Sequence, residues 1–293
     1  PVSGAKLMVS DSSGGIVEEW VTDETPHRMF LAAGDYVLSE TQAPEGYAAA
    51  EPKAFTVTDE RGVQTIELED APLSLVISKQ GEEPDAELPG ARLQLLDARG
   101  VEIAAWTTAE QPHTIKYLPK GSYTLRELAA PEGYSLAADL TFILEDTAKP
   151  QYVTMKNTKT QTEITKTDFA TGEELPGAEL VITDAEGNEI ERWVSTEEPH
   201  KISGLPVGEY TLTETIAPEG YAMAESVKFT VTDTGEIQKV EMKDQPLEVE
   251  ISKTDITTGE ELPGAELVIT DAEGKEIERW VSTEEPHKIS GLP

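Results

Sequence analysis

Three sets of reactive side chains recur along the chain with a constant spacing of 87 residues. The first set consists of lysines, the second of glutamates, and the third of asparagine or aspartate residues. The sets are Lys79, Lys166 and Lys253; Glu40, Glu127 and Glu214; and Asp70, Asn157 and Asp244. A neutral amine is a nucleophile, a carboxamide or carboxylic acid is an electrophile, and a glutamate can polarise the carbonyl and carry protons. The pattern therefore indicates an amide bond between lysine and Asn/Asp side chains, assisted by the glutamate.

Strand alternation places these polar residues on faces that are otherwise apolar. Side chains two residues apart in a strand share a face. Each polar residue extends such a row: Leu75, Ile77 and Lys79; Tyr123, Leu125 and Glu127; Val153, Met155 and Asn157. Burial pushes a lysine towards its neutral form and a carboxylic acid towards its protonated form. Close approach of amine and carbonyl then raises their effective concentration, and we expect Asn157 to release ammonia and Asp244 to release water.

A buried ion pair or hydrogen-bonded cluster is the alternative interpretation of the same residues. Ion pairs between buried side chains occur without any chemistry. However, an ion pair with lysine would favour aspartate in every copy, whereas a bond-forming site can use either Asn157 or Asp244. The residues alone leave both interpretations open.

Short alternating runs bounded by Gly, Pro, Asp and Asn predict an all-β chain. In the third copy of the period we expect seven strands, at about 162–167, 178–184, 189–196, 200–203, 209–216, 226–232 and 236–243. Seven short strands in fewer than 90 residues are typical of a small β-sandwich. Asn157 and Lys166 are only nine residues apart, with no Gly/Ser linker between them, so we expect the sandwiches to form an extended, fairly stiff rod.

Composition excludes several classes of partner. The net charge is −34, from 23 basic and 57 acidic residues, which argues against nucleic acid and against an anionic membrane surface. The chain has no cysteine, so disulfides cannot stabilise it. No signal peptide or membrane-spanning run is visible. We expect no cofactor.

One tryptophan and one Pro-His pair also occur in each copy. They are Trp20, Trp106, Trp193 and Trp280, and His27, His113, His200 and His287. We expect the tryptophans to cover each sandwich, with a carbohydrate platform as the alternative. We expect the histidines to lie in separate surface loops rather than in a metal site. Acidic loops such as Glu173-Glu174 lack the spacing of a calcium loop and are expected to be solvated.

The recurring motifs resemble a known family. They are a Ser-Lys-Thr-Asp strand, a Leu-Pro-Gly-Ala turn and a Glu-x-x-Ala-Pro-Glu-Gly-Tyr segment, as at Lys253, Leu262 and Glu214. Together they are similar to the Cna B-type (SpaA-like) domain of Gram-positive surface proteins and pilins, over essentially the whole chain. The resemblance implies a prealbumin-like (transthyretin-like, reverse immunoglobulin-like) β-sandwich. It also implies an autocatalytic Lys–Asn/Asp isopeptide bond between the first and last strands, with a glutamate as catalyst.

The resemblance assigns the residues to four repeats. We expect a partial domain at residues 1–71 (repeat one), complete domains at 72–158 (repeat two) and 159–245 (repeat three), and the first part of a further domain at 246–293 (the last repeat). It implies the bonds Lys79–Asn157, with Glu127, and Lys166–Asp244, with Glu214. Glu40 and Asp70 in repeat one, and Lys253 in the last repeat, lack reaction partners within the chain. Repeat two departs from the family after its lysine, where Gln80-Gly81 replaces Thr-Asp.

The expected function is that of a structural stalk or spacer. We expect a segment of an extracellular, cell-wall-anchored adhesin or pilus-like protein, monomeric, in contact with neighbouring repeats and not inserted in a membrane. We expect no enzyme activity beyond the single-turnover crosslink. The alternative is a ligand-binding adhesin module for a host matrix protein or glycan. Near-identical repeats favour the spacer, because a binder needs only one good site.

Overall fold

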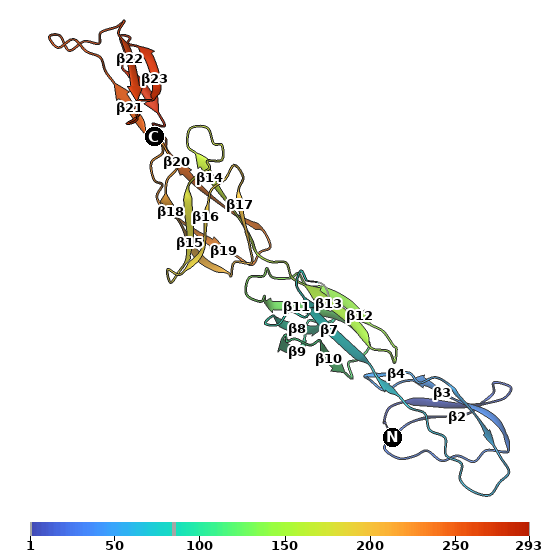
Figure 1. The fold of residues 1–293 in the computed structure, drawn as a ribbon. Coiled ribbons are helices and arrows are strands. Elements are labelled where there is room, and N and C mark those ends of the chain that lie inside the picture. Colours follow the sequence, from blue (N-terminus) through green and yellow to red (C-terminus); the bar gives the residue numbers. More distant parts are fainter. Residues whose placement is uncertain (1, 84–85, 293) are drawn as a thin grey trace. The chain divides into compact units, whose positions relative to one another are not determined.

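Strands are the only regular secondary structure in the part of the chain that the structure describes, residues 2–83 and 86–292 (Figure 1). The structure is a computed structural model. It divides into two compact units: residues 1–159 with 233–235, and residues 160–232 with 236–293. Repeats one and two lie in the first unit, and repeat three and the last repeat lie in the second. The all-β class expected from the sequence is confirmed.

Repeat two forms two sheets. A three-stranded sheet has the order β10-β7-β13, and a four-stranded sheet has the order β12-β11-β8-β9. The strands are β7 (Ser74–Gln80), β8 (Arg92–Asp97), β9 (Glu102–Thr107), β10 (His113–Lys116), β11 (Gly121–Ala129), β12 (Leu140–Leu144) and β13 (Gln151–Lys156).

Repeat three has the same topology, with sheets in the orders β17-β14-β20 and β16-β15-β18-β19. Its strands are β14 (Gln161–Asp168), β15 (Glu179–Asp184), β16 (Glu189–Val194), β17 (His200–Ser203), β18 (Gly208–Ile216), β19 (Val227–Val231) and β20 (Ile237–Asp244). All seven strands expected from the sequence are present, and their ends lie within two residues of the expected positions. The alternation of apolar and polar residues predicts these strands correctly because one face of each strand is buried.

The first and last strands of each complete repeat are parallel neighbours. β7 pairs with β13 so that Lys79 lies opposite Met155, and β14 pairs with β20 so that Lys166 lies opposite Met242. Parallel neighbours need a crossover connection. Here the crossover comprises all the other strands of the sandwich, so the two strands that enclose each repeat in sequence meet side by side in space.

Each complete repeat has its own apolar core. In repeat two, Leu75, Leu93, Leu95 and Leu125 are completely buried, and Trp106 packs against this cluster from its edge. In repeat three the equivalent cluster is closed by Trp193. The tryptophans therefore cover the sandwiches, as the sequence predicted.

The end repeats form smaller sheets within the described residues. Repeat one has a four-stranded sheet in the order β2-β1-β3-β5 and a short pair of β4 with β6, and the last repeat has the pairs β21-β24 and β22-β23. The strands are β1 (Lys6–Asp11), β2 (Ile16–Val21), β3 (Gly34–Gln42), β4 (Tyr47–Ala48), β5 (Lys53–Val57), β6 (Ala71–Pro72), β21 (Glu248–Ile251), β22 (Glu266–Thr270), β23 (Glu276–Val281) and β24 (His287–Ser290).

Candidate functional site

The lysine of repeat two lies at the inner end of a buried strand row. Lys79 continues the inward row of Leu75 and Ile77 on β7, and only 1% of its surface is exposed. Alternation dictates this direction: for Lys79 to face solvent, the whole apolar row would have to face solvent too. The long aliphatic stem packs as part of the core and carries the amine to the end of the sandwich.

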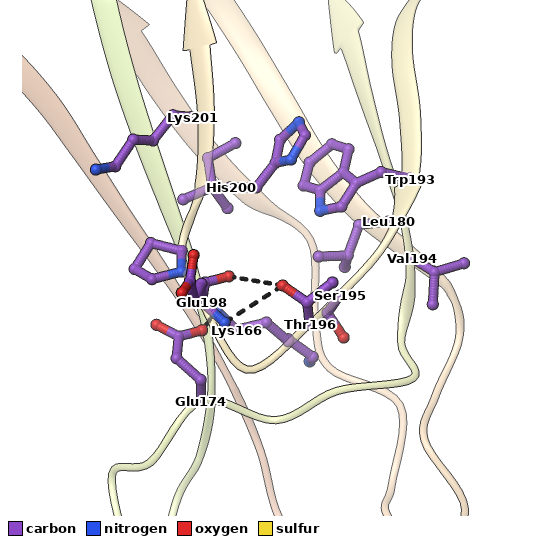
Figure 2. Close-up of a pocket in the computed structure, with 12 residues that line it drawn as sticks. Lys166, Glu174, Leu180, Trp193, Val194, Ser195, Thr196, Glu198, His200 and Lys201 are labelled. Carbon is purple, nitrogen blue, oxygen red and sulfur yellow. Dashed lines mark hydrogen bonds between the residues drawn. The ribbon is translucent and has the colours of Figure 1, made fainter.

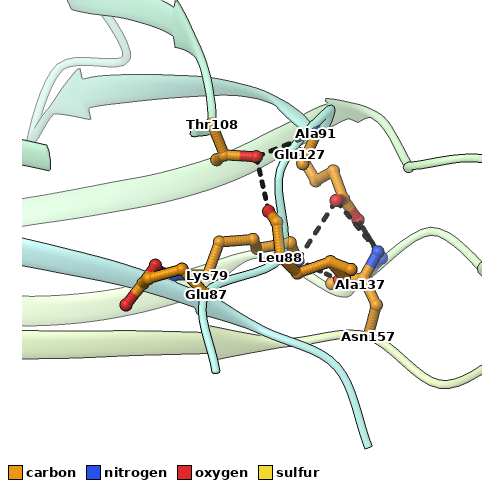
Figure 3. A network of polar contacts seen from close by, with 8 residues as sticks. All are labelled: Lys79, Glu87, Leu88, Ala91, Thr108, Glu127, Ala137 and Asn157. Carbon is orange, nitrogen blue, oxygen red and sulfur yellow. Dashed lines mark hydrogen bonds and ion pairs between the residues drawn. The ribbon is translucent and has the colours of Figure 1, made fainter. Parts of the chain in front are cut away.

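The asparagine reaches the same point from the neighbouring strand. Asn157 follows directly after β13, and its main-chain N–H donates to the carbonyl of Gln80 at 2.9 Å, continuing the parallel pairing. The Lys79 amine donates to Oδ1 of Asn157 (Figure 3). The amine thus lies against the carbonyl group with which the sequence predicted it to react.

The glutamate comes from the opposite sheet. Glu127 on β11 crosses the core and lies 3.1 Å from the Lys79 amine, measured to Oε1. Nδ2 of Asn157 donates to both oxygens of Glu127 at 3.0 Å (Figure 3). The main-chain N–H of Ala137 donates to Oε2 at 2.6 Å and fixes the carboxylate in place. Glu127 therefore contacts both the nitrogen that would attack and the nitrogen that would leave.

Repeat three contains the same arrangement with aspartate in place of asparagine. Lys166 is 2% exposed, and its amine contacts Oδ1 of Asp244, which is fully buried. Oε1 of Glu214, on β18 of the opposite sheet, lies 3.0 Å from the amine. The N–H of Ala224 donates to Oε2 of Glu214 at 2.7 Å. The structure thus brings together both complete sets of predicted residues.

Burial dominates the electrostatics of both sites. It lowers the pKa of Lys79, although the nearby Glu127 carboxylate acts in the opposite direction. It raises the pKa of Asp244 to about 6, against the opposing effect of Lys166. Oδ2 of Asp244 is buried and has no hydrogen-bond partner among the described residues. A proton on this carboxyl group would remove the buried negative charge, in agreement with the direction of the pKa change.

The end repeats hold incomplete sets. In repeat one, burial raises the pKa of both Glu40 and Asp70, and the Asp70 carboxylate raises that of Glu40 further. The N–H of Ala50 donates to Glu40 at 2.6 Å, as at the other two glutamates. In the last repeat, Lys253 is half-buried and forms no ion pair with any residue that the structure describes. Among the described residues of these two repeats, no lysine amine lies against a side-chain carboxyl or amide group of the recurring Asn/Asp set.

A second recurring glutamate differs from its expected position and contacts the main chain of the reactive lysine. Glu174, expected to be solvated, is half-buried, and it accepts a hydrogen bond from the main-chain N–H of Lys166 at 3.2 Å. Glu87 makes the same contact with Lys79 at 2.9 Å. The signal was available, because Glu87, Glu174 and Glu261 are also 87 residues apart. Because these glutamates precede a turn, where polar residues are usually exposed, their position alone predicts solvation.

Three of the four histidines differ from the expected loop position, whereas His27 lies outside the strands as expected. His113, His200 and His287 are not in loops but begin strands β10, β17 and β24. Each ring, like that of His27, stacks on the tryptophan of its own repeat at 4.3–4.4 Å between centroids. Because Trp106 and Trp193 pack against their cores and also stack on a histidine, little of their ring surface is left for a sugar. The contact joins the edges of the two sheets.

Three of the four histidines also contact a glutamate, which provides a natural comparison. Nε2 of His200 lies 2.8 Å from Glu191, and His27 and His287 have the same contact, but Ala104 occupies this position in repeat two. Burial lowers the pKa of His113. We expect Ala104→Glu to raise it, because a nearby carboxylate favours the charged imidazole. NMR titration measures this, with Ala105→Glu on the opposite face of β9 as the control; an unchanged pKa would contradict the expected contact.

A small pocket opens beside the lysine of repeat three (Figure 2). Lys166, Glu174, Trp193 and His200 are among its lining residues, and its volume is about 130 Å³. Pockets that hold drug-sized ligands measure about 300–1,000 Å³, whereas one water occupies about 30 Å³. The pocket has room for a few water molecules and is too small for an oligosaccharide.

Fold and site together define a class of protein: tandem prealbumin-like β-sandwiches with a buried lysine, glutamate and Asn/Asp at one end of each complete sandwich. The model of the SpaA family, described as a prealbumin-like fold domain, matches residues 1–72, 73–159 and 160–246. The chain belongs to this family. The resemblance inferred from its motifs is thereby confirmed.

Several solved structures are similar to the chain. The Bacillus anthracis TIE protein is 25% identical over 99% of this chain, with a TM-score of 0.43, and the chain spans 61% of that protein's length. The shaft pilin SpaA of Lactobacillus rhamnosus GG is 18% identical (59% of this chain, 97% of the pilin, TM-score 0.28). BcpA, the major pilin of Bacillus cereus, is 18% identical (84% and 95%, TM-score 0.35). Among curated proteins, none matches the chain. The described residues include no helix long and apolar enough to cross a membrane.

Proposed function

We propose that this chain is a stalk segment of an extracellular, cell-wall-anchored adhesin or pilus-like protein, stabilised by isopeptide bonds that it forms without another enzyme. Membership of the SpaA family supports a structural role in a pilus or surface protein. The bonds proposed are Lys79–Asn157 and Lys166–Asp244. Residues 72–158 and 159–245 are the complete units, 1–71 and 246–293 are partial ones, and the partners are neighbouring repeats.

The position of Glu127 between two nitrogens is the observation that carries this proposal. Glu127 lies 3.1 Å from the Lys79 amine and 3.0 Å from the Asn157 amide nitrogen. It takes a proton from the Lys79 ammonium, and the neutral amine attacks the Asn157 side-chain carbonyl carbon. A new C–N bond forms and the bond to Nδ2 breaks, while one proton from the attacking nitrogen and one from Glu127 convert the departing NH2 group into an ammonium ion and restore the Glu127 carboxylate.

Repeat three follows the same course with a different leaving group. The neutral Lys166 amine attacks the carboxyl carbon of protonated Asp244, and Glu214 transfers protons between the attacking nitrogen and the departing oxygen. One C–N bond forms, one C–O bond breaks, and one water leaves. The buried position of all three groups supports this course, because excluding bulk water strengthens the interactions that stabilise the developing charge.

The location of each bond gives it a mechanical role. In a linear array, tension enters a repeat at its first strand and leaves at its last strand. Lys79 is on the first strand of repeat two and Asn157 directly follows the last. A covalent bond between them carries the load past the remaining strands, so the sandwich cannot be pulled apart without breaking a covalent bond.

Mass measurement on the denatured chain tests the proposal. We expect the parent chain to be lighter than its sequence mass by one ammonia and one water. Lys79→Ala should abolish only the ammonia loss, and Glu214→Ala only the water loss, because the two sites are in separate sandwiches. Peptide mapping should recover Lys79 joined to Asn157 and Lys166 joined to Asp244. Lys253→Ala is the matched control and should leave both losses intact.

An unmodified mass for a folded parent chain would refute the crosslinks. Loss of both bonds in either single-site variant would contradict independent action of the two repeats. Either result would leave the SpaA-family sandwich fold in place, since the fold depends on the strands and cores described above.

A further inference from the structure

The main chain of each reactive lysine lies beyond the end of a paired edge. β10 pairs with β7 only as far as Ile77, and β17 pairs with β14 only as far as Ile164. Lys79 and Lys166 each lie two residues further along. Their peptide N–H and C=O groups are buried with the side chain and need partners, because an unpaired buried main-chain group is costly. Side chains and turns must supply the hydrogen-bond partners that the neighbouring strand does not provide for these peptide groups.

A Glu-Leu pair supplies both partners, and we call it the Glu-Leu clamp. The glutamate side chain accepts a hydrogen bond from the main-chain N–H of the lysine. The main-chain N–H of the leucine that follows donates a hydrogen bond to the main-chain carbonyl of the same lysine. In repeat two, Glu87 and Leu88 make these bonds to Lys79 at 2.9 and 2.6 Å (Figure 3). In repeat three, Glu174 and Leu175 make them to Lys166 at 3.2 and 2.7 Å. Glu261 and Leu262 hold Lys253 in the same way at 3.0 and 2.6 Å.

A hydroxyl group behind the clamp fixes it to the opposite sheet. The Ser195 hydroxyl, which follows β16, donates to the Leu175 carbonyl at 2.7 Å and accepts from the Ala178 N–H at 2.9 Å. Thr108 does the same for Leu88 and Ala91 in repeat two, as Figure 3 shows. Between these anchors Gly177 has φ of +96°, a left-handed conformation that favours glycine. The Leu-Pro-Gly-Ala turn is therefore held at both ends.

We infer that Glu87 and Glu174 are positioning residues for crosslink formation, which fix the main chain of the reactive lysine so that its amine meets the Asn/Asp carbonyl. This inference rests on the proposed function. The contact is to the lysine main chain and not to the amine, so neither glutamate transfers protons. Glu127 and Glu214, at 3.1 and 3.0 Å from the amines, have that role.

The clamp matters for rate because the reaction depends on close approach. A displacement of about 1 Å at a reacting group can cost about a hundredfold in rate. A lysine has a flexible stem, so a fixed main chain limits the volume that its amine can explore. A purely structural turn would instead affect folding stability and leave the rate in the folded repeat unchanged. The two roles can be separated by measuring rate and stability independently.

Glu174→Ala provides the test, with repeat two of the same molecule as an internal clock. The chain is synthesised in a cell-free system, quenched in denaturant at successive times, and digested. Mass spectrometry then quantifies the Lys166–Asp244 and Lys79–Asn157 peptides. We expect Glu174→Ala to slow the first bond about tenfold or more and to leave the second unchanged. Glu174→Gln, which keeps an acceptor oxygen, should recover most of the rate, and exposed Glu173→Ala should match the parent.

Folding is checked on the same variants in the Glu214→Gln background, where no bond forms in repeat three. If Glu174→Ala unfolds this repeat, Glu174→Asp carries the test, because its shorter side chain should lose the N–H contact and slow the bond similarly. If the folded Glu174→Ala or Glu174→Asp variant forms the Lys166–Asp244 bond as fast as the parent chain, the inference is overturned, although both crosslinks still form. A parent chain with neither crosslink would instead refute the proposed function, and the inference with it.

Discussion

Eliminating the crosslink in repeat two or three should lower its free energy of unfolding by about 4 to 5 kcal/mol. Each proposed bond closes a loop between residues 78 positions apart, as from Lys79 to Asn157. The unfolded chain loses conformational entropy when such a loop is closed, and the relation used for disulfides gives this magnitude for a loop of that length. The effect is large because a whole domain is typically stable by only about 5 to 15 kcal/mol.

The variant must remove the bond without leaving an unpaired charge in the core. Lys79→Ala alone would leave the Glu127 carboxylate buried without its cation, which is costly for a separate reason. We therefore choose Lys79→Met with Glu127→Gln, which keeps the volume and removes both charges. Denaturant unfolding, followed by the NMR signal of the Trp106 indole N–H, measures the change in the free energy of unfolding. Lys253→Met, at a site with no crosslink partner in the chain, should change stability by much less.

Single-molecule stretching gives the sharpest form of the same prediction. The parent repeat should show no unfolding extension before the covalent chain fails, whereas the Lys79→Met/Glu127→Gln repeat should extend. If parent and variant extend at similar forces, the load does not pass through the bond. Equal unfolding free energies would likewise contradict the entropic account.

Formation of the Lys166–Asp244 bond should slow as the pH rises above about 6, whereas formation of the Lys79–Asn157 bond should not. Burial raises the pKa of Asp244 to about 6, so this carboxyl group loses its proton above that pH. A carboxylate is a poor electrophile, and its oxygen leaves as water only when protons are supplied. Beyond the midpoint, we expect the rate to fall by up to about tenfold per pH unit.

The number of protons that each site requires explains why the two bonds should differ in the pH dependence of their formation. In repeat two, one proton shared by Lys79 and Glu127 is sufficient, because its transfer from the ammonium to the carboxylate creates both the nucleophile and the acid. Exchange with solvent is not needed, so the rate is level near neutral pH. In repeat three, Asp244 adds a second carboxyl group and requires a second proton. Above pH 6 the site holds one proton too few.

Exchanging the two electrophiles is the matched control. Asp244→Asn should remove the fall in rate in repeat three, and Asn157→Asp should introduce one in repeat two. The cell-free time course, run from pH 5 to pH 8, measures both bonds in one molecule. Parallel pH profiles for the two parent repeats would rule out this assignment of the titrating group.

Alternation along the strands made much of this fold predictable. One buried face per strand fixes the parity of Lys166 and Glu214, and turn residues mark where strands end. The pairing of strands across a whole domain has no local signal. Alternation alone therefore leaves open which strands are neighbours, and it does not reveal that Glu214 faces Lys166 from the opposite sheet.

Contacts made by the main chain were the hardest to foresee. Glu174 is conspicuous only through the N–H of Lys166, and no pattern of side-chain types reveals which peptide groups lack a strand partner. The stacking of His200 on Trp193 likewise joins two sheet edges whose proximity depends on the complete sandwich. Repetition was the one usable signal in both cases, since each contact recurs in other repeats.

The parallel pairing of first and last strands also determines how far such a chain can lengthen. With Lys79 joined to Asn157 and Lys166 joined to Asp244, the residues within each closed loop contribute no contour length under load. Only the nine peptide units that separate Asn157 from Lys166 remain free to straighten between the two bonds. At about 3.4 Å per residue this is roughly 30 Å. In an array of such crosslinked repeats, tension applied at one end would be transmitted to the other end with little extension of the chain between successive bonds.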